Sequence, residues 1–218
     1  MLDGRGLQPR IAYEFSERPT QSRAELVKLT KASPKNGQYY YLLGRVDRQN
    51  QHLEDAIADF RKAIELDQGY MRTYEELGQC QESLGLTEDA RKTYELAAFR
   101  NRYQRVHWAW SPLDYGVFLL KTNDMGQAEK LIRESLQYNP RFGWAHYYMG
   151  QLLQKQGKDK EAIGEYQEAV VDDPKHRQAW LALGREYTRL GRKPEAAKAL
   201  AMFQKLNSQE EAIKHKSP

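Results

Sequence analysis

A recurring pair, a large residue followed by glycine, constrains this chain more than any other sequence feature. The pair occurs five times, at Leu43-Gly44, Leu77-Gly78, Tyr115-Gly116, Met149-Gly150 and Leu183-Gly184. Successive glycines are 34, 38, 34 and 34 residues apart. Five alanines have the same spacing: Ala56, Ala90, Ala128, Ala162 and Ala196. Because two residue types report one period with one insertion, the chain consists of repeated structural units.

Each repeat predicts two helices joined by a tight turn. In the fourth repeat the first helix begins near Trp144, and Gly157 supplies the positive φ that the turn requires. Ala162, Tyr166 and Ala169 are spaced to lie on one face of the second helix. The same turn is predicted at Gly85, Asn123 and Gly191. Small residues such as Gly150 and Ala162 let the two helices of a pair approach closely, while large residues fill the space around them.

The order of these positions resembles the tetratricopeptide repeat family: a bulky residue with Leu-Gly, then Gly, Ala, Phe or Tyr, Ala and Pro. The resemblance covers roughly residues 37–210 as five repeats, which are 37–70, 71–104, 109–142, 143–176 and 177–210. It implies an all-α fold, an α-solenoid in which helix-turn-helix units stack into a right-handed superhelix.

The ends of the chain depart from the period. Residues 23–36 fit the second half of one more repeat, so we expect the solenoid to cover 23–210. Residues 1–22 carry no period and form an aperiodic N-terminal segment. Ser208 with Glu211 three residues later predicts the start of a short polar capping helix, followed by a polar tail within residues 211–218.

Residues 105–108 are an insertion between the second and third repeats. The segment from Arg100 to Trp110 combines arginines with large aromatic residues, and Ser111-Pro112 predicts an N-cap followed by a first-turn proline. We expect the insertion to lengthen the preceding helix or to form a structural elbow with Trp108 buried between repeats. Arginine beside aromatic residues also suits single-stranded nucleic acid. The net charge is only +4 and scattered, which disfavours that interpretation.

Composition excludes several other classes. No apolar run approaches the roughly 18 residues of a membrane span, and no signal peptide is recognisable at the N-terminus. We therefore expect a cytoplasmic protein, with a periplasmic or secreted mature chain as the alternative. Cys80 is the single cysteine, which excludes an internal disulfide, and we expect a buried structural thiol. The five histidines are far apart, so we expect no metal and no cofactor.

The resemblance implies a concave face made by the first helix of each repeat, where a peptide or protein partner binds. Aromatic residues gather there in the third and fourth repeats, and such residues often carry most of the binding energy. Acidic residues precede them and basic residues follow, which suits a peptide with an apolar middle and opposite charges at its ends. The alternative is that the aromatic residues only pack between helices. The candidate binding residues are Tyr41, Arg45, Glu75, Glu76, Trp110, Asp114, Trp144, Tyr147, Tyr148, Gln151, Lys155, Arg185 and Arg189.

These observations predict a non-catalytic scaffold or adaptor that binds another protein. The chain lacks the basic and amide residues of the chaperone-tail clamp known in this family, and no catalytic residues are proposed. The alternative function is an accessory module of a longer enzyme or of a cell-envelope assembly protein. Leu200, Phe203 and Leu206 in the last repeat also predict weak self-association through the final helices.

Overall fold

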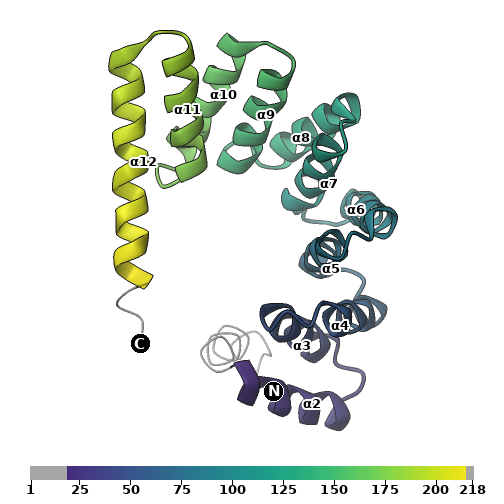
Figure 1. Cartoon of the computed structure of the whole chain (residues 1–218). Coiled ribbons are helices and arrows are strands. Elements are labelled where there is room, and N and C mark those ends of the chain that lie inside the picture. Colours follow the sequence, from purple (N-terminus) through teal and green to yellow (C-terminus); the bar gives the residue numbers. More distant parts are fainter. Residues whose placement is uncertain (1–18, 215–218) are drawn as a thin grey trace. The chain divides into compact units, whose positions relative to one another are not determined.

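The computed structural model describes the backbone of residues 19–214. This part of the chain is helical, with turns and short loops between helices α2 to α12 (Figure 1). The chain divides into two compact units, an N-terminal unit of residues 1–111 and a C-terminal unit of residues 112–218.

The N-terminal unit is a stack of consecutive helices, each packed against the next (Figure 1). Its apolar core contains Leu26, Tyr41 and Phe60, which come from three different helices. The helices are α2 (Pro19–Ala32), α3 (Gly37–Gln49), α4 (Leu53–Leu66), α5 (Met71–Ser83) and α6 (Thr87–Asn101). The part of this unit that the structure describes, from residue 19 onward, thus holds one helix followed by two complete helix pairs.

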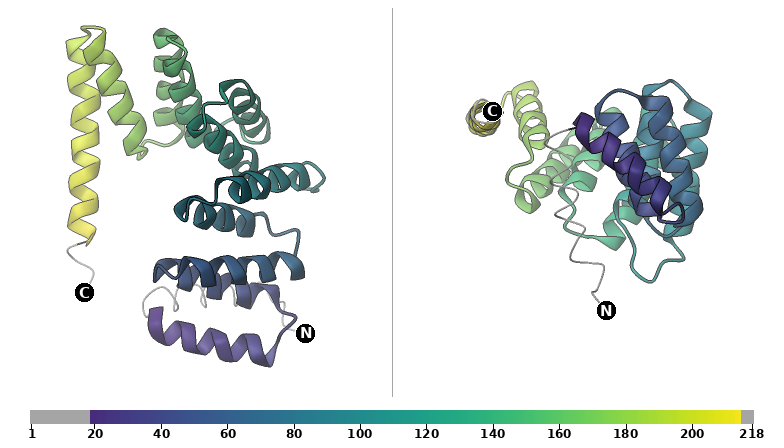
Figure 2. Two further views of the ribbon diagram at one scale, coloured as in Figure 1. Left: turned by 45° about the vertical axis from the view of Figure 1, so that its right-hand side comes forward. Right: turned by 90° about the horizontal axis from the view of Figure 1, so that it is seen from below.

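The C-terminal unit contains three more helix pairs. Buried side chains from each pair, such as Ile132, Tyr166 and Leu183, fill the spaces between helices. The helices are α7 (Trp110–Lys121, whose first two residues precede the unit), α8 (Met125–Tyr138), α9 (Gly143–Lys155), α10 (Asp159–Asp172), α11 (Arg177–Arg189) and α12 (Lys193–Lys214). Figure 2 shows that α12 extends well beyond its partner α11.

In four of the five helix pairs of the described chain, the turn has the predicted left-handed residue. The φ angles are +71° at Gly85, +68° at Asn123, +75° at Gly157 and +70° at Gly191, as the repeat predicts. The first pair uses Gln51 instead, with φ of +62°. Gln51 lies 34 residues before Gly85, so the period of the repeat alone indicates a turn there. The residue type does not, because glutamine has no special preference for positive φ.

The recurring glycine allows the closest approach within each pair, as predicted. A Cβ placed at Gly150 would lie 2.5 Å from the ring of Tyr166, and one at Gly44 would lie 2.8 Å from the ring of Phe60. In the last pair, a Cβ at Gly184 would lie 2.5 Å from Leu200. The side chain sixteen residues later therefore fills the space that glycine leaves empty.

Two predicted boundaries are wrong at the ends of the solenoid. Helix α2, the first in the described part of the chain, begins at Pro19, four residues before the expected start at residue 23, because proline is favourable in a first helical turn. The capping helix does not exist as a separate element, since α12 runs without a break from Lys193 to Lys214 and contains both Ser208 and Glu211. After Pro194 the helix has no glycine or proline, so extending it is easier than starting a new one. Residues 1–18 and 215–218 lie outside the described residues.

The insertion also differs from expectation. Helix α6 has 15 residues, against 14 in α4, so the insertion does not lengthen it appreciably. Residues 102–109 form a loop in which Trp108 is 38% exposed, and the predicted burial of Trp108 is wrong. Helix α7 begins at Trp110, which places Ser111 inside its first turn. Trp108 is exposed because the side chain of Asn101 hydrogen-bonds to the backbone of Trp108 and holds this residue in the loop.

Among the described residues, none of the helices combines the length and apolarity that crossing a membrane would require.

Candidate functional site

Three aromatic residues of α9 form a partly exposed cluster in the C-terminal unit. Tyr147 and Tyr148 follow Trp144 by three and four residues, so all three side chains lie on one side of the helix. The ring centroids of Trp144 and Tyr147 are 6.1 Å apart, and those of Tyr147 and Tyr148 are 5.1 Å apart. Sequence reasoning predicted this gathering. The rings contact one another and still keep part of their surface exposed, so packing and recognition are both compatible with the geometry.

His176 completes the cluster, although sequence reasoning did not select it. Its ring centroid lies 4.1 Å from that of Trp144 and 5.0 Å from that of Tyr147, and the residue is buried. The backbone N–H of Ala179 donates to His176 Nδ1, so His176 caps α11. Burial lowers the pKa of His176, which keeps the ring neutral. The available signal was its place just before a predicted helix, where a capping residue belongs.

A cavity of about 140 Å³ lies between α9 and α11, next to this cluster. Its walls combine three glutamine amides, two tyrosine rings, two small or aliphatic side chains and one arginine. The lining residues are Tyr147, Gln151, Gln154, Tyr166, Gln178, Leu181, Ala182 and Arg185. The first helices of the fourth and fifth repeats therefore form a hollowed surface, at positions that the family resemblance assigns to the concave face.

The two arginines predicted for this face have different surroundings. Arg189 pairs with Asp159 at 2.5 Å and with Glu186 at 2.6 Å. Arg185 is exposed and has neither a hydrogen bond nor an ion pair within the described part of the chain. Its charge opposes the rise that burial causes in the pKa of Tyr147. Arg185 is thus available to an anionic group, whereas Arg189 already has two carboxylates.

Buried polar groups hold the floor of the cavity in place. Tyr166 donates its hydroxyl hydrogen to Gln154 Oε1 at 3.1 Å, and Gln154 Nε2 donates to the buried Glu186. On the open side, Gln151 Nε2 donates to the hydroxyl oxygen of Tyr147 at 2.7 Å. Because these amides are oriented before a ligand arrives, little side-chain entropy is lost on binding.

Lys155, another predicted binding residue, has a structural contact. Its ammonium group donates to the carbonyl oxygen of Leu120, near the C-terminal end of α7, at 3.3 Å. Cations are favourable at this end of a helix because the last carbonyl groups lack partners. The contact joins α9 to α7.

In the N-terminal unit, the predicted residues are close together but are mostly occupied. Tyr41 is buried, and its ring packs against Tyr70 at 5.0 Å, so it offers little surface to a partner. Arg45 and Arg48 both pair with Glu76, at 3.7 and 2.9 Å. Glu75 is partly buried, and burial followed by the Glu76 charge raises its pKa.

Trp110 and Asp114, the remaining predicted residues, lie four residues apart in the first half of α7, where both are partly buried. Trp110 precedes the boundary between the units, and its contact with the aromatic residues of α9 stays a prediction.

One cluster near α3 has the residue types of a cation site. Ligand atoms of Asp47, His52 and Asp55 lie within 4.8 Å of one another. Arg23 already pairs with Asp47 at 2.5 Å and with Asp55 at 3.1 Å, so both carboxylates have a counter-charge. Burial raises the pKa of the neighbouring Asp59 to about 7, and the negative charges of Asp47 and Asp55 contribute the next largest part of the rise. The cluster is an ion-pair network linking α2 to α3 and α4.

Cys80 has the surroundings predicted for it. The thiol is fully buried, and burial raises its pKa to about 11, which keeps it protonated and unreactive at neutral pH.

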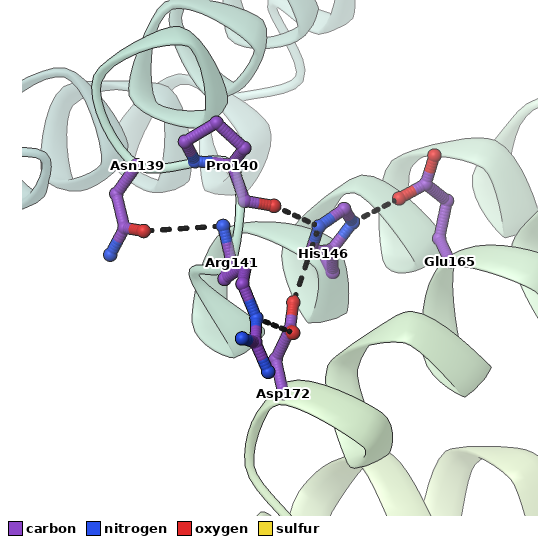
Figure 3. Close-up of polar contacts among 6 residues, drawn as sticks. All are labelled: Asn139, Pro140, Arg141, His146, Glu165 and Asp172. Carbon is purple, nitrogen blue, oxygen red and sulfur yellow. Dashed lines mark hydrogen bonds and ion pairs between the residues drawn. The ribbon is translucent and has the colours of Figure 1, made fainter.

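His146 lies in a polar network in the C-terminal unit (Figure 3). Its Nδ1 is 2.7 Å from Glu165 Oε2, and its Nε2 is 3.1 Å from the carbonyl oxygen of Pro140. Asp172 lies 3.7 Å from Nε2 and also accepts from Arg141. Glu165, the Pro140 carbonyl and Asp172 raise the pKa of His146, while burial opposes them. The ring ties the loop before α9 to α10, and both nitrogens are occupied.

The described residues thus define a helical-repeat protein with a polar cavity beside an aromatic cluster. A family model described as tetratricopeptide repeat matches residues 11–70, 41–104, 118–175 and 147–211. The chain belongs to the tetratricopeptide repeat family.

Comparison with known proteins also gives one curated relative, Superkiller protein 3 of Schizosaccharomyces pombe. It is 27% identical over an alignment of 174 positions, which covers 73% of this chain and 12% of that protein. The chain therefore spans about an eighth of this relative's length.

Several solved structures share the fold. PilW, described as a widely conserved type IV pilus biogenesis factor, superposes with a TM-score of 0.74 at 16% identity, covering 94% of each chain. PilF of Pseudomonas aeruginosa gives 0.73 at 17% identity, covering 92% of this chain and 95% of its own. YrrB, described as having an unusual peptide-binding site, gives 0.57 at 19% identity, covering 87% and 96%.

Proposed function

We propose that this chain is a non-catalytic scaffold that binds a peptide segment of another protein on the face formed by α9 and α11. The observation that carries the proposal is the cavity of about 140 Å³ beside the exposed and unpaired guanidinium of Arg185. A charged group with no counter-ion, at the edge of a preformed hollow, favours a ligand that brings a carboxylate.

The walls of the cavity suit a peptide. Glutamine amides both donate and accept hydrogen bonds, as the N–H and C=O groups of a peptide backbone require. The aromatic cluster of Trp144, Tyr147 and Tyr148 offers an apolar surface next to these amides. A cavity of this volume accommodates part of a segment, such as one side chain, while the remainder lies along the helices. The peptide-binding site described for YrrB, which has the same fold, adds support.

Selection from a random peptide library displayed on phage would test this function. Peptides that bind the purified chain are synthesised, and their affinities are compared for wild type, Arg185→Gln and Arg189→Gln. We expect Arg185→Gln to weaken binding about tenfold, which corresponds to about 1.4 kcal/mol, without changing the melting temperature. Arg189→Gln is the matched control. Because Arg189 already forms ion pairs with Asp159 and Glu186, we expect its loss to lower the melting temperature more than the peptide affinity.

Two outcomes would contradict the proposal. One is a library that yields no binding peptide. The other is a set of selected peptides that bind Arg185→Gln as tightly as wild type. Truncating Trp144 to alanine then separates the two roles of the aromatic cluster, since a packing role lowers the melting temperature and leaves the affinity of the folded protein intact.

A second function, an accessory module of a longer protein, is favoured by one observation. The chain matches only 12% of Superkiller protein 3, so a stretch of repeats like this one also occurs inside a much larger chain. Immunoblotting of the source cells with an antibody against the purified chain distinguishes the two. A band far larger than 25.5 kDa supports the module, and a band at that mass contradicts it.

A further inference from the structure

The loop between α6 and α7 exposes an unusual amount of apolar surface in the N-terminal unit. Val106 is 81% exposed and Tyr103 is 77% exposed. Together with these two, Tyr70, Phe99 and Trp108 form what we call the insertion surface. Isolated exposed apolar residues are common, but five large ones from one loop and its neighbouring helix ends indicate a contact surface.

The loop is held in shape by a buried side chain. Asn101 is fully buried, and its Nδ2 donates to the carbonyl oxygen of Trp108 at 3.1 Å, while its Oδ1 accepts from the N–H of Trp108 at 2.8 Å. His107 Nδ1 is also 2.9 Å from the backbone oxygen of Asn101. These contacts tie the end of the loop to the end of α6.

A cavity of about 360 Å³ lies between this loop and the start of α5. Its volume falls within the range of about 300–1,000 Å³ that is usual for binding pockets. Apolar side chains dominate its walls, and Arg72 and Gln104 add polar groups. The lining residues are Gly69, Tyr70, Met71, Arg72, Gln104, Val106 and Trp108. This space can receive one or two apolar side chains.

The loop that carries the insertion surface has a positive charge. Residues 96–113 contain Arg100, Arg102 and Arg105 and no aspartate or glutamate. Arg100 donates to Gln68 at 2.7 Å, and Arg105 is exposed with no hydrogen bond or ion pair to any residue that the structure describes. A ligand with negative charges beside an apolar group complements this surface.

We propose that the insertion surface docks an acidic peptide segment whose apolar side chain enters the cavity beside Trp108 and Val106. A protein ligand is favoured over nucleic acid because the cavity is lined by aliphatic and aromatic side chains and suits a single anchor. A backbone of phosphates would instead need a row of unpaired cations. This surface belongs to the N-terminal unit, whereas the face of α9 and α11 belongs to the C-terminal unit.

Fluorescence anisotropy with two synthetic peptide pools tests the proposal. In one pool a central Leu, Phe or Trp is flanked by Asp and Glu, and in the other the same central residue is flanked by Lys. We expect the full chain to bind the acidic pool at least tenfold more tightly than the basic pool. Val106→Asp and Arg105→Glu should each reduce that affinity about tenfold, and their melting temperatures should equal that of wild type because both side chains are exposed.

Two control variants show whether the loss of binding is specific to the insertion surface. Lys92→Glu, on the exposed side of α6, makes the same change in net charge as Arg105→Glu and should leave binding unchanged. Arg185→Gln should also leave it unchanged, which distinguishes the insertion surface from the proposed peptide face of α9 and α11.

Four results would overturn the proposal: equal binding of both pools, no binding of the acidic pool, an equal loss in Lys92→Glu, or tighter binding of a fluorescent twelve-residue oligodeoxythymidine. The last result would make the surface a nucleic-acid site.

Discussion

Gly150 shows how one absent side chain determines the packing of a whole repeat. A Cβ at this position would lie 2.5 Å from Cε1 of Tyr166, which is well inside van der Waals contact, so that something would have to shift. The ring of Tyr166 is fully buried and its hydroxyl is bonded to Gln154, so it cannot move aside without breaking other contacts. The glycine is therefore required by the neighbouring helix, and its own backbone conformation is ordinary.

Gly150→Leu should lower the free energy of unfolding by about 3 kcal/mol, because the new side chain overlaps the buried ring of Tyr166, which cannot shift without breaking other contacts. Urea denaturation followed by circular dichroism measures this. Gly164→Leu in α10 is the matched control, since a Cβ there meets nothing within 4 Å and leucine favours a helix over glycine. Equal stability of Gly150→Leu and wild type would show that the assigned contact is wrong.

His146 makes stability depend on pH. Its two ring nitrogens face Glu165 and the Pro140 carbonyl, which only accept hydrogen bonds, so both contacts are satisfied when the ring is protonated. The folded pKa is raised above the ordinary value of 6.5. The resulting stabilisation is fully present below the unfolded pKa and is lost as the pH rises through the folded pKa.

His146→Gln should therefore destabilise the chain by about 1–2 kcal/mol at pH 6 and progressively less at higher pH. Thermal unfolding of both proteins from pH 5 to 9 measures the difference. Wild type and variant are compared at each pH, because His176 also makes stability depend on pH. Burial lowers the pKa of His176, so its contribution to stability changes with pH in the opposite direction, and it cancels in the difference between the two proteins. A constant difference over this pH range would contradict a protonated His146.

Among the elements, α12 departs most from the repeat. It has 22 residues, whereas α11 has 13, and Arg177 of α11 holds the extension through Asn207 and Glu210. Leu200 fills the space at Gly184, while Phe203 and Leu206 are only partly buried. No further helix of the described part packs on α12. A partly covered apolar stripe of this kind favours association with a second copy.

We expect weak self-association of the chain through α12 at high micromolar concentration. Phe203→Glu should abolish it by placing a charge in the stripe, and Gln204→Glu, at an exposed position of the same helix, should not. Sedimentation equilibrium of the three proteins measures the effect. A wild-type chain that remains monomeric at that concentration would refute the expectation.

At the scale of the whole molecule, contacts occur mainly between neighbouring helices. Within the N-terminal unit α2 to α6 each pack on the next helix, within the C-terminal unit α8 to α12 do the same, and the residues divide into these two compact units. Repeat proteins of this kind have a stability that is approximately a sum of local terms, so parts of them open separately.

Hydrogen exchange should reveal this behaviour in the Gly150→Leu variant. Amide protons of α9, α10 and α11 should exchange faster than in wild type, whereas those of α3, α4 and α5 should keep their protection. Mass spectrometry of peptic fragments gives both rates from one sample. Uniform loss of protection along the chain would instead indicate a single cooperative unit.

The sequence by itself determined the features that depend on nearby residues. Its period located the helix pairs, and the turns at Gly85, Asn123, Gly157 and Gly191 followed from glycine and asparagine tolerating positive φ. It also placed Gly150 at a close helix contact, because both partners recur with the repeat. These properties are local or strictly periodic, and for that reason they can be read from the order of residues.

Only the tertiary structure decided which residues of the predicted face are available. Arg185 and Arg189 look equivalent in the sequence, yet Arg189 is paired with Asp159, thirty residues earlier, and Arg185 is not. Tyr41 was predicted to face a partner and is buried, whereas Trp108 was predicted to be buried and is exposed because Asn101 fixes its loop. Long side chains reach neighbours that are distant along the chain, so their pairing and exposure depend on how separate helices pack.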